Sequence, residues 1–332
     1  MRRALVLLAA LLLGACAAPP LSPPPAPPGS IAPHLTATEF VADDGAVLPL
    51  RSWRPEGETT AVILALHGFN DYSNAFTATA EDWAKQGIAT YAYDQRGFGE
   101  APNRGGWVGA KRLALDAEEV AALLRKRYPG RTLILLGESM GGAVAIVAAT
   151  GAEGTPPPAV DGLVVVAPAV WGRGSMTLLE RAALWLADGV VPGMTVTGQG
   201  LHIKPSDNTE MLRAFSRDPL VIKETRIATI KGLVDLMDDA AAAAPHLRAP
   251  MLFLYGDRDE VIPKEPTRRF LVALPEDEQR RVAFYPDGYH MLLRDLDAPL
   301  VREDVAAWLS NRDGPLPSGA DRHAQETLTA TR

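Results

Sequence analysis

The sequence predicts an α/β fold in which helices flank a mostly parallel β-sheet and a helical insertion covers one end. Short runs of consecutive apolar residues, typical of strands buried on both faces, alternate with longer segments of helical periodicity. Such alternation is typical of βαβ units. Of the 332 residues, 47% are hydrophobic and 22% are charged, so the chain can form a large folded domain and is not disordered throughout.

The first half of the chain carries the clearest pattern. Glu39–Ala42 and Val47–Trp53 flank a turn sequence, Asp43-Asp44-Gly45, which indicates two antiparallel strands. Alternating strands and helices should then follow. The strands are expected at Ala61–Leu66, Ile88–Tyr93 and Thr132–Leu136, and the helices at Asn74–Gln86, Lys111–Tyr128 and Gly141–Ala149.

The second half continues the sheet but interrupts the alternation. Further strands are expected at Leu163–Ala167, Met251–Tyr255 and Val282–Tyr285. Between the first two of these, residues of about 170–248 have helical character, as in Leu178-Leu179 and Trp185-Leu186. A βαβ crossover needs far fewer residues, so we predict a helical cap over one end of the sheet. The alternative is a pair of surface helices without a functional role.

The first fifteen residues have the organisation of a secretory signal peptide. Two arginines precede the apolar run Ala4–Leu13, which is too short to span a bilayer as a mature helix. The next residues resemble a bacterial lipobox that ends at Cys16. We therefore expect residues 1–15 to be a lipoprotein signal peptide and Cys16 to be lipidated, with an ordinary signal peptide as the alternative. Ala17 favours an outer-membrane location in the bacterial cell envelope, facing the periplasm.

Both ends of the mature chain lack a pattern for core packing. Residues 16–36 are rich in Pro and Ala, which favours extended polyproline geometry and predicts a linker that holds the domain away from a membrane. A Pro-rich ligand for a partner domain is the alternative for this segment. Residues 311–332 contain Gly, Pro and Ser without apolar periodicity, which predicts a flexible C-terminal tail. The folded domain is expected over residues 37–310.

Charge and composition exclude several classes of protein. The formal net charge is −7, and it becomes more negative if Arg2 and Arg3 leave with the signal peptide. This balance argues against nucleic acid as a partner. A single cysteine excludes an internal disulfide, a thiolate zinc site and an iron–sulfur cluster. A dinucleotide motif at Gly97 fails because Pro102 stands in place of its third glycine. We expect no cofactor and no metal.

Residues Gly137–Gly141 read G-E-S-M-G, the G-x-S-x-G pattern of a nucleophilic serine. The pattern is weak by itself, but here it follows a predicted strand and opens a predicted helix. Ser139 would then lie on a sharp strand-to-helix turn, where flanking glycines relieve crowding. A tight turn with an unreactive serine is the alternative. We predict Ser139 as the nucleophile.

His290 is the histidine best placed to act as a base, because it follows a late strand and a turn. An acid should lie between Ser139 and His290 in the sequence. The segment after Met251–Tyr255 supplies Asp257, Asp259 and Glu260. The order serine, acid, histidine is that of α/β-hydrolases. The other histidines lie in the linker, in a different motif, in the cap or in the tail: His34, His67, His202, His246 and His323.

An acyl-transfer site also needs donors for the developing oxyanion. The loop His67-Gly68-Phe69 directly follows a buried strand, and it would place the backbone amide of Phe69 beside that of Met140. We therefore predict these two amides as the oxyanion hole. His67 could alternatively be a base, but its position before Ser139, at the end of a strand, favours a bracing role in the loop.

Five segments together resemble the monoacylglycerol lipase and lysophospholipase group of α/β-hydrolases, which overlaps with serine aminopeptidase-like hydrolases. They are His67–Phe69, Asp94–Gly99, Gly137–Gly142, Gly256–Asp259 and Tyr289–His290. The resemblance extends over about residues 39–309 and implies an α/β-hydrolase fold with a cap. It also implies that Asp259 is the acid and that Asp257 is a surface or turn residue. Gln95 and Phe98 depart from the histidines usual in this group, which bears on substrate preference.

The expected function is that of a lipid-anchored serine hydrolase, which cleaves carboxylic esters of monoacyl lipids through an acyl-enzyme. Its partners would be a small lipid or ester substrate and the membrane that holds Cys16. A serine at position 139 argues against dehalogenase or epoxide hydrolase chemistry, which uses aspartate there. The alternatives are a peptidase acting on short peptides, a small-ester or thioester hydrolase, and a non-catalytic envelope lipoprotein. The sequence does not indicate an oligomeric state.

Overall fold

The computed structural model of the protein describes residues 26–151, 157–198, 200, 203–276 and 279–330. The expected signal peptide, Cys16 and the first part of the linker lie outside these residues. Within the described ranges, no helix combines the length and the apolar character needed to cross a membrane.

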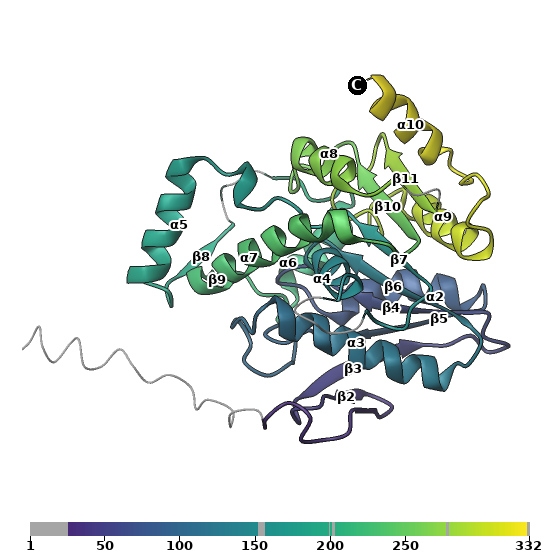
Figure 1. Ribbon diagram of the computed structural model, residues 1–332, viewed down its shortest axis with the longest axis horizontal. Coiled ribbons are helices and arrows are strands. Elements are labelled where there is room, and N and C mark those ends of the chain that lie inside the picture. Colours follow the sequence, from purple (N-terminus) through teal and green to yellow (C-terminus); the bar gives the residue numbers. More distant parts are fainter. Residues whose placement is uncertain (1–25, 152–156, 199, 201–202, 277–278, 331–332) are drawn as a thin grey trace, which may run out of the picture.

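A single mixed sheet forms the centre of the molecule (Figure 1). In the described residues it has nine strands in the order β1-β2-β3-β5-β4-β6-β7-β10-β11. The first three strands and the β3–β5 pair are antiparallel, whereas all pairs from β5 to β11 are parallel. The strands are β1 (His34–Leu35), β2 (Glu39–Val41), β3 (Val47–Trp53), β4 (Ala61–Leu66), β5 (Ile88–Tyr93), β6 (Thr132–Glu138), β7 (Gly162–Val166), β10 (Met251–Gly256) and β11 (Arg280–Tyr285).

Helices cover both faces of the sheet, which explains why its central strands are continuous apolar runs. Every residue of β4 and β5 is buried. One hydrophobic core joins the sheet to α3 (Ala110–Arg127), α4 (Met140–Ala149), α7 (Ile227–Ala243) and α8 (Lys264–Ala273). A second core joins it to η1 (Ser73–Phe76), α2 (Thr77–Ala84) and α9 (Ala298–Ser310). The predicted fold class, a mostly parallel sheet flanked by helices, is confirmed.

The strands predicted from apolar runs match the structure closely, and the two N-terminal strands form the expected antiparallel pair. The predicted linker extends too far, because β1 already pairs with β2 within it through His34 and Val41. The apolar-run criterion did not identify α8 and α9, whose sequences mix charged and apolar residues.

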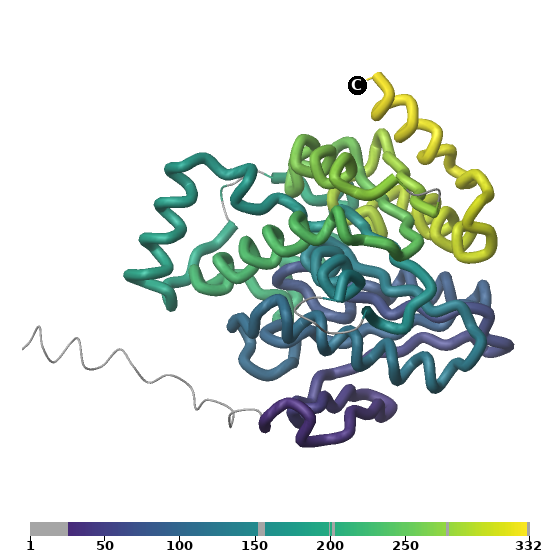
Figure 2. Tube along the Cα trace, viewed as in Figure 1, coloured from purple at the N-terminus to yellow at the C-terminus, as the bar shows by residue number. Residues whose placement is uncertain are grey.

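The insertion is narrower than expected. Its C-terminal helix, α7, packs against α3 and α4, so it is one of the covering helices of the sheet and not part of a separate cap. The part that stands away from the sheet comprises η3 (Arg173–Ser175), α5 (Leu178–Val190), β8 (Thr195–Thr197), α6 (Thr209–Arg217) and β9 (Glu224–Arg226). We call this part the cap, and its elements α5, β8 and β9 lie at the left of the molecule in Figures 1 and 2.

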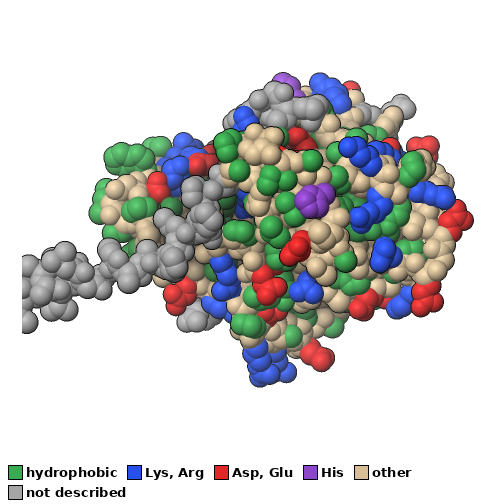
Figure 3. All heavy atoms as spheres, turned by 90° about the horizontal axis from the view of Figure 1, so that it is seen from below, with side chains coloured by type: hydrophobic (Ala, Val, Ile, Leu, Met, Phe, Trp, Pro, Cys, Tyr) green, Lys and Arg blue, Asp and Glu red, His purple; other side chains and the backbone are tan. Residues whose placement is uncertain are grey.

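Helix α5 presents an apolar surface to solvent. None of its residues is buried, although it contains five large apolar side chains that are mostly exposed. Its first turn is stabilised by a capping box between Thr177 and Glu180. Green side chains gather at the cap end of the molecule in Figure 3. The exposed residues of α5 are Leu178 (82% exposed), Leu179 (79%), Trp185 (75%), Leu186 (58%) and Val190 (68%).

The prediction of a flexible C-terminal tail is wrong for residues 320–330, which form a helix. Helix α10 (Ala320–Ala330) packs along β11, the last strand of the sheet (Figure 2). Ala320 and Ala324 are buried, and Asp321 forms an ion pair with Arg281 of β11. Covering the open edge of a sheet limits pairing with other chains. Small alanines make this contact, so the segment carries no strong apolar signal.

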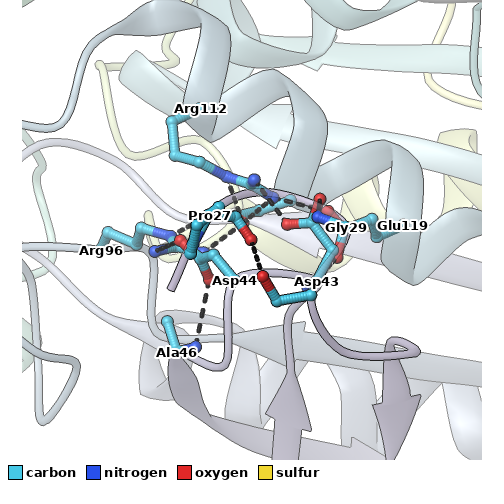
Figure 4. Close-up of polar contacts among 10 residues, drawn as sticks. Pro27, Gly29, Asp43, Asp44, Ala46, Arg96, Arg112 and Glu119 are labelled. Atoms are coloured by element: carbon cyan, nitrogen blue, oxygen red, sulfur yellow. Dashed lines mark hydrogen bonds and ion pairs between the residues drawn. The ribbon is translucent and has the colours of Figure 1, made fainter. Parts of the chain in front are cut away.

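A buried ion network fixes the N-terminal hairpin to the body (Figure 4). Arg96, in the loop after β5, contacts Asp44 of the hairpin and Asp116 of α3, each at 2.7 Å. Arg112 of α3 contacts Asp43 of the hairpin at 2.7 Å and Glu119 of α3 at 2.6 Å. Burial raises the pKa of Glu119 to about 7. The contacts of Arg96 thus tie the loop after β5 to the hairpin and to α3.

Candidate active site

The predicted site residues gather at the carboxyl ends of the parallel strands. Phe69 follows β4, Ser139 follows β6, Asp259 follows β10 and His290 follows β11. The strands β4, β6, β7, β10 and β11 are parallel to one another. The loops that follow them therefore emerge at the same edge of the sheet. The structure thus brings four distant parts of the chain to one edge.

Ser139 lies on a strained turn between β6 and α4. Its backbone has φ 54° and ψ −116°, a conformation that residues with a side chain rarely adopt. A Cβ at position 137 would collide with the carbonyl of Gly141, and one at position 141 would collide with that of Leu66. These two glycines are therefore required by close packing, as the G-x-S-x-G pattern predicts.

Asp259 and His290 form a buried pair. Nδ1 of His290 lies 2.8 Å from Oδ2 of Asp259. The other carboxylate oxygen of Asp259 accepts hydrogen bonds from the backbone amides of Val261 and Ile262, at 2.7 and 2.9 Å. These bonds fix the direction of the carboxylate, so that Oδ2 can accept a hydrogen bond from Nδ1–H of His290. Nε2 of His290 is then free to accept a proton.

Asp257 lies in a different environment. One oxygen of its carboxylate lies 2.8 Å from Nε2 of His323 in α10, and the other lies 3.3 Å from Nζ of Lys264. It links the acid loop to the C-terminal helix. The geometry therefore distinguishes the two aspartates that the sequence offered, since only Asp259 contacts His290.

Two backbone amides are available near Ser139. Gly68 lies against the serine, because a Cβ at position 68 would be 3.4 Å from Cβ of Ser139. Met140 is the first residue of α4, so its amide has no partner within the helix. In the described part of the chain, neither the amide of Phe69 nor that of Met140 donates a backbone hydrogen bond. An oxyanion formed at Ser139 could accept hydrogen bonds from both amides.

His67 has the bracing contacts expected of it. Its Nε2 accepts a hydrogen bond from the backbone amide of Gln95 at 2.9 Å, so its proton is on Nδ1, which donates to the carbonyl of Gly68 at 2.9 Å. Complete burial lowers the pKa of His67, which keeps the ring neutral. Because a trans peptide points its N–H away from its carbonyl, this bond turns the amide of Phe69 away from His67.

The cap also holds the loop that carries Phe69. The side-chain amide of Asn70 donates to the hydroxyl of Thr225 at 2.7 Å, and the carbonyl of Asn70 accepts from the amide of Ile222 at 2.9 Å. Asn70 has a φ of 64°, a conformation that asparagine tolerates better than most residues. Sequence reasoning did not identify this contact, because nothing local to Asn70 indicates a partner more than 150 residues away.

In the structure the predicted acid, Asp259, contacts the predicted base, His290, but the base does not contact the predicted nucleophile, Ser139, through a hydrogen bond in the described residues. The catalytic roles of Ser139, Asp259 and His290 and the oxyanion role of Phe69 and Met140 remain predictions, supported by a shared location and by the Asp259–His290 contact.

The model of a protein family described as serine aminopeptidase, S33 matches residues 57–297, well over half of the chain. The match includes the loops that carry Phe69, Ser139, Asp259 and His290. The chain belongs to this family. The predicted active-site residues all lie within the matched region.

Characterised relatives are similar over nearly the whole domain. A monoacylglycerol lipase of Mycolicibacterium smegmatis is 27% identical, over 81% of this chain and 95% of the relative. The monoglyceride lipase of Homo sapiens is 26% identical, over 84% of this chain and 92% of the relative. The family resemblance inferred from short motifs therefore extends over most of the folded domain.

Solved structures confirm the α/β-hydrolase fold. The crystal structure of a monoacylglycerol lipase from Paleococcus ferrophilus superimposes with a TM-score of 0.65 at 22% identity, over 80% of this chain and 99% of that one. A soluble variant of monoglyceride lipase from Saccharomyces cerevisiae, in complex with a substrate analogue, has a TM-score of 0.68 at 19% identity, over 85% and 95% of the two chains. At these identities the likeness concerns the fold alone.

Proposed function

We propose that this protein is a serine hydrolase that cleaves the carboxylic ester bond of monoacyl lipids, such as monoacylglycerols or lysophospholipids. The observation that carries the proposal is the Asp259–His290 pair at the sheet edge where Ser139 lies on its strained turn. The names of two relatives, a monoacylglycerol lipase and a monoglyceride lipase, support the substrate class.

The proposed mechanism follows from the roles of the three side chains. His290 accepts the proton of Ser139 through Nε2 while the serine oxygen attacks the ester carbonyl, and Asp259 stabilises the imidazolium that forms. The amides of Phe69 and Met140 would donate to the negatively charged oxygen. Collapse of this intermediate breaks the ester bond, and His290 returns the proton to the departing alcohol. Water, deprotonated by His290, then releases the fatty acid from Ser139.

The exposed apolar surface of the cap favours the proposal that the substrate has a long apolar chain. Four of the large apolar side chains of α5, namely Leu178, Leu179, Trp185 and Leu186, are exposed, whereas Leu184 packs partly against the core. Each CH₂ group that a substrate buries on such a surface contributes about 0.8 kcal/mol. Binding should therefore depend on chain length, and the four exposed side chains are available because they are not part of the core.

Peptide hydrolysis is the second candidate, and one observation favours it. The family that matches residues 57–297 is described as serine aminopeptidase, and amide and ester hydrolysis share the same acyl-enzyme chemistry. The substrate panel below separates the two candidates, since a peptidase would prefer aminoacyl amides to acyl esters.

The test begins with Ser139→Ala. Members of a catalytic triad act as a unit, so we expect a loss of roughly 10⁴-fold or more in kcat with the fold retained. A fluorophosphonate should label the unchanged protein and not the variant. Equal labelling of both would overturn the assignment of Ser139 as the nucleophile.

A substrate panel then tests the class of substrate. The measurement is kcat/KM for esters with acyl chains of different length, for monoacylglycerols and lysophospholipids, and for aminoacyl amides. The proposal expects medium- and long-chain monoacyl esters to be preferred. A preference for aminoacyl amides would favour the peptidase, and a preference for acetyl esters would favour a small-ester hydrolase.

We further propose that Cys16 carries a lipid anchor and that the enzyme is attached to the bacterial cell envelope, in the outer membrane facing the periplasm. The support is the sequence pattern that ends at Cys16. Cys16→Ser should move the protein out of the detergent phase in a partitioning experiment or leave it as a precursor. Ester hydrolysis by the folded domain should not change. Unchanged partitioning would contradict the anchor.

A further inference from the structure

Arg294 lies where three loops of the candidate site meet. It follows His290 by four residues, and its guanidinium contacts two carboxylates from other parts of the chain. Nη1 lies 2.8 Å from Oδ2 of Asp71, and Nη2 lies 3.3 Å from Oε2 of Glu138. The side chains of these three residues are 12%, 5% and 3% exposed, so the cluster is almost fully shielded from water.

Each carboxylate lies next to a predicted functional group. Glu138 immediately precedes Ser139, as the last residue of β6. Asp71 follows Phe69 by two residues, and its amide donates to the carbonyl of Gly68 at 3.3 Å. The guanidinium therefore connects the loop of His290 to the turn that carries Ser139 and to the loop that carries the Phe69 amide.

The arrangement requires a guanidinium group. Arginine has several donors in a rigid planar fork, so two of its nitrogens can reach two carboxylates at once, here through an ion pair with Asp71 and a hydrogen bond to Glu138, whereas the ammonium of lysine is a single point of charge. Burial raises the pKa of Glu138, and the charge of Arg294 opposes this effect. Loss of the arginine would leave two buried carboxylates without a counter-ion, which is strongly destabilising.

The segment around Arg294 also fixes the base and the cap. The next residue, Asp295, accepts hydrogen bonds from the amide of Tyr289 at 2.7 Å and from the hydroxyl of Ser206 at 2.6 Å. The guanidinium of Arg294 lies 5.7 Å from the centre of the Phe215 ring in α6. His290 lies between Tyr289 and Arg294 along the chain. A displacement of Arg294 should therefore also displace His290.

We propose that Arg294 is a positioning residue for the hydrolytic reaction, which holds the nucleophile, the base and the oxyanion donor in register through Asp71 and Glu138. The inference rests on the proposed function, because it needs Ser139 and His290 to react. It goes beyond the triad, since Arg294 touches neither substrate nor the reacting atoms. A displacement of about 1 Å at such a site can lower the rate about 10²-fold.

The test compares four variants in the full chain. Arg294→Met removes the guanidinium. The triple variant Arg294→Met, Asp71→Asn, Glu138→Gln also removes the stranded charges, so it separates loss of positioning from charge burial. Arg294→Lys keeps the charge without the fork. Arg302→Met is the matched control, because Arg302 is similarly buried and pairs with Asp82, away from the site.

Three quantities are measured on each variant: thermal stability, kcat and KM for an acetyl ester, and the rate of labelling by a fluorophosphonate. An acetyl ester avoids effects of the cap on long chains. We expect the triple variant to fold and to lose about 10²-fold in kcat and labelling rate, with KM within about threefold of the unchanged enzyme. Arg294→Lys should lose about tenfold, and Arg302→Met should keep its kcat.

A folded triple variant with the kcat of the unchanged enzyme would overturn the proposal, because it would show that Arg294 only neutralises buried acids. If the triple variant does not fold, Arg294→Lys decides: a reduced kcat at full folding supports positioning, and an unchanged kcat contradicts it. Failure of the unchanged enzyme to react at Ser139 would overturn the proposed function and this inference together, whereas normal labelling of both enzyme and variants would overturn only the inference.

Discussion

Helices α4 and α5 both carry several large apolar side chains, but they lie in opposite environments. Nine of the ten residues of α4 are buried, between the sheet and the helices α3 and α7. None of the thirteen residues of α5 is buried, because the helix contacts the body mainly through α7. The apolar content of α4 stabilises the core behind Ser139. That of α5 is left on the surface, which we propose as the binding surface for a substrate chain.

The comparison separates two uses of apolar residues. In the body they hold the strand ends that carry the site, so a change there should affect folding or the geometry of catalysis. In the cap they contribute little to folding, so a change there should affect substrate selection. Large exposed apolar surfaces on soluble domains commonly mark binding sites. The following predictions test this division.

The largest effect is expected at the buried acid of the body. Asp259→Asn should lower kcat by about 10³- to 10⁴-fold, because an amide cannot hold the required tautomer of His290 or stabilise its charged form. Asp257→Asn is the matched control and should have a small effect, since Asp257 contacts His323 and Lys264 instead. The measurement is kcat on a short-chain ester. A larger loss for Asp257→Asn would contradict the assignment of the acid.

Substitutions of apolar residues should lower the free energy of unfolding more in the body than in the cap. Phe253 of β10 is fully buried and stacks on Phe270 at 6.0 Å, so Phe253→Ala should lower the free energy of unfolding by about 3 to 5 kcal/mol. Leu179→Ala on α5 should change it by less than about 0.5 kcal/mol. Denaturant unfolding of both variants checks the prediction. Comparable losses would mean that α5 packs against a part of the protein in solution.

Substitutions in the cap should change how kcat/KM depends on acyl-chain length, and should not change the rate of the chemical step. Replacing Leu178, Leu179 and Leu186 by serine should lower kcat/KM for long-chain monoacyl esters by about tenfold and leave that for acetyl esters within about twofold. The measurement is a series of esters from two to sixteen carbons. Parallel losses at every length would show that the exposed face of α5 has a structural role, and an unchanged profile would mean that the acyl chain binds elsewhere.

The smallest effect concerns the pH dependence of stability in the body. Burial raises the pKa of Glu119 to about 7, so the folded state holds its proton more tightly than the unfolded chain does. The stability from this group is complete below about pH 4.5 and is lost as the pH rises through 7, by on the order of 1 to 2 kcal/mol. Glu119→Gln should lack this part of the slope. Identical pH profiles of unfolding for both proteins would contradict the raised pKa.

Much of the fold could be predicted from local patterns. Continuous apolar runs located β4 and β5 at their observed bounds, since a strand buried on both faces requires such a run, and the turn signal Asp43-Asp44-Gly45 located β3. The strained turn at Ser139 was predictable for a related reason, because close packing at its two sides excludes any residue except glycine. The sequence order of Ser139, Asp259 and His290 likewise depends on the chain alone.

Other features depended on contacts between distant segments. Asp257 and Asp259 are two residues apart in one loop. The family resemblance implied Asp259 as the acid, but the contact itself is visible only in the folded chain, where His290 lies against Asp259. Helix α10 packs through two small alanines, so its sequence resembles that of a loose tail until β11 lies beside it. The role of Arg294 is similar, since its two carboxylate partners lie 223 and 156 residues away along the chain.

The sequence by itself determined the order of the strands along the chain, the turn at Ser139 and the family, because these depend on backbone geometry and on the residues next to each position. Only the tertiary structure decided that α4 is buried and α5 exposed, that Asp259 contacts His290, and that Arg294 joins three loops. Burial and ion pairing depend on which segments the folded chain brings together, and apolar residues read locally do not carry that information.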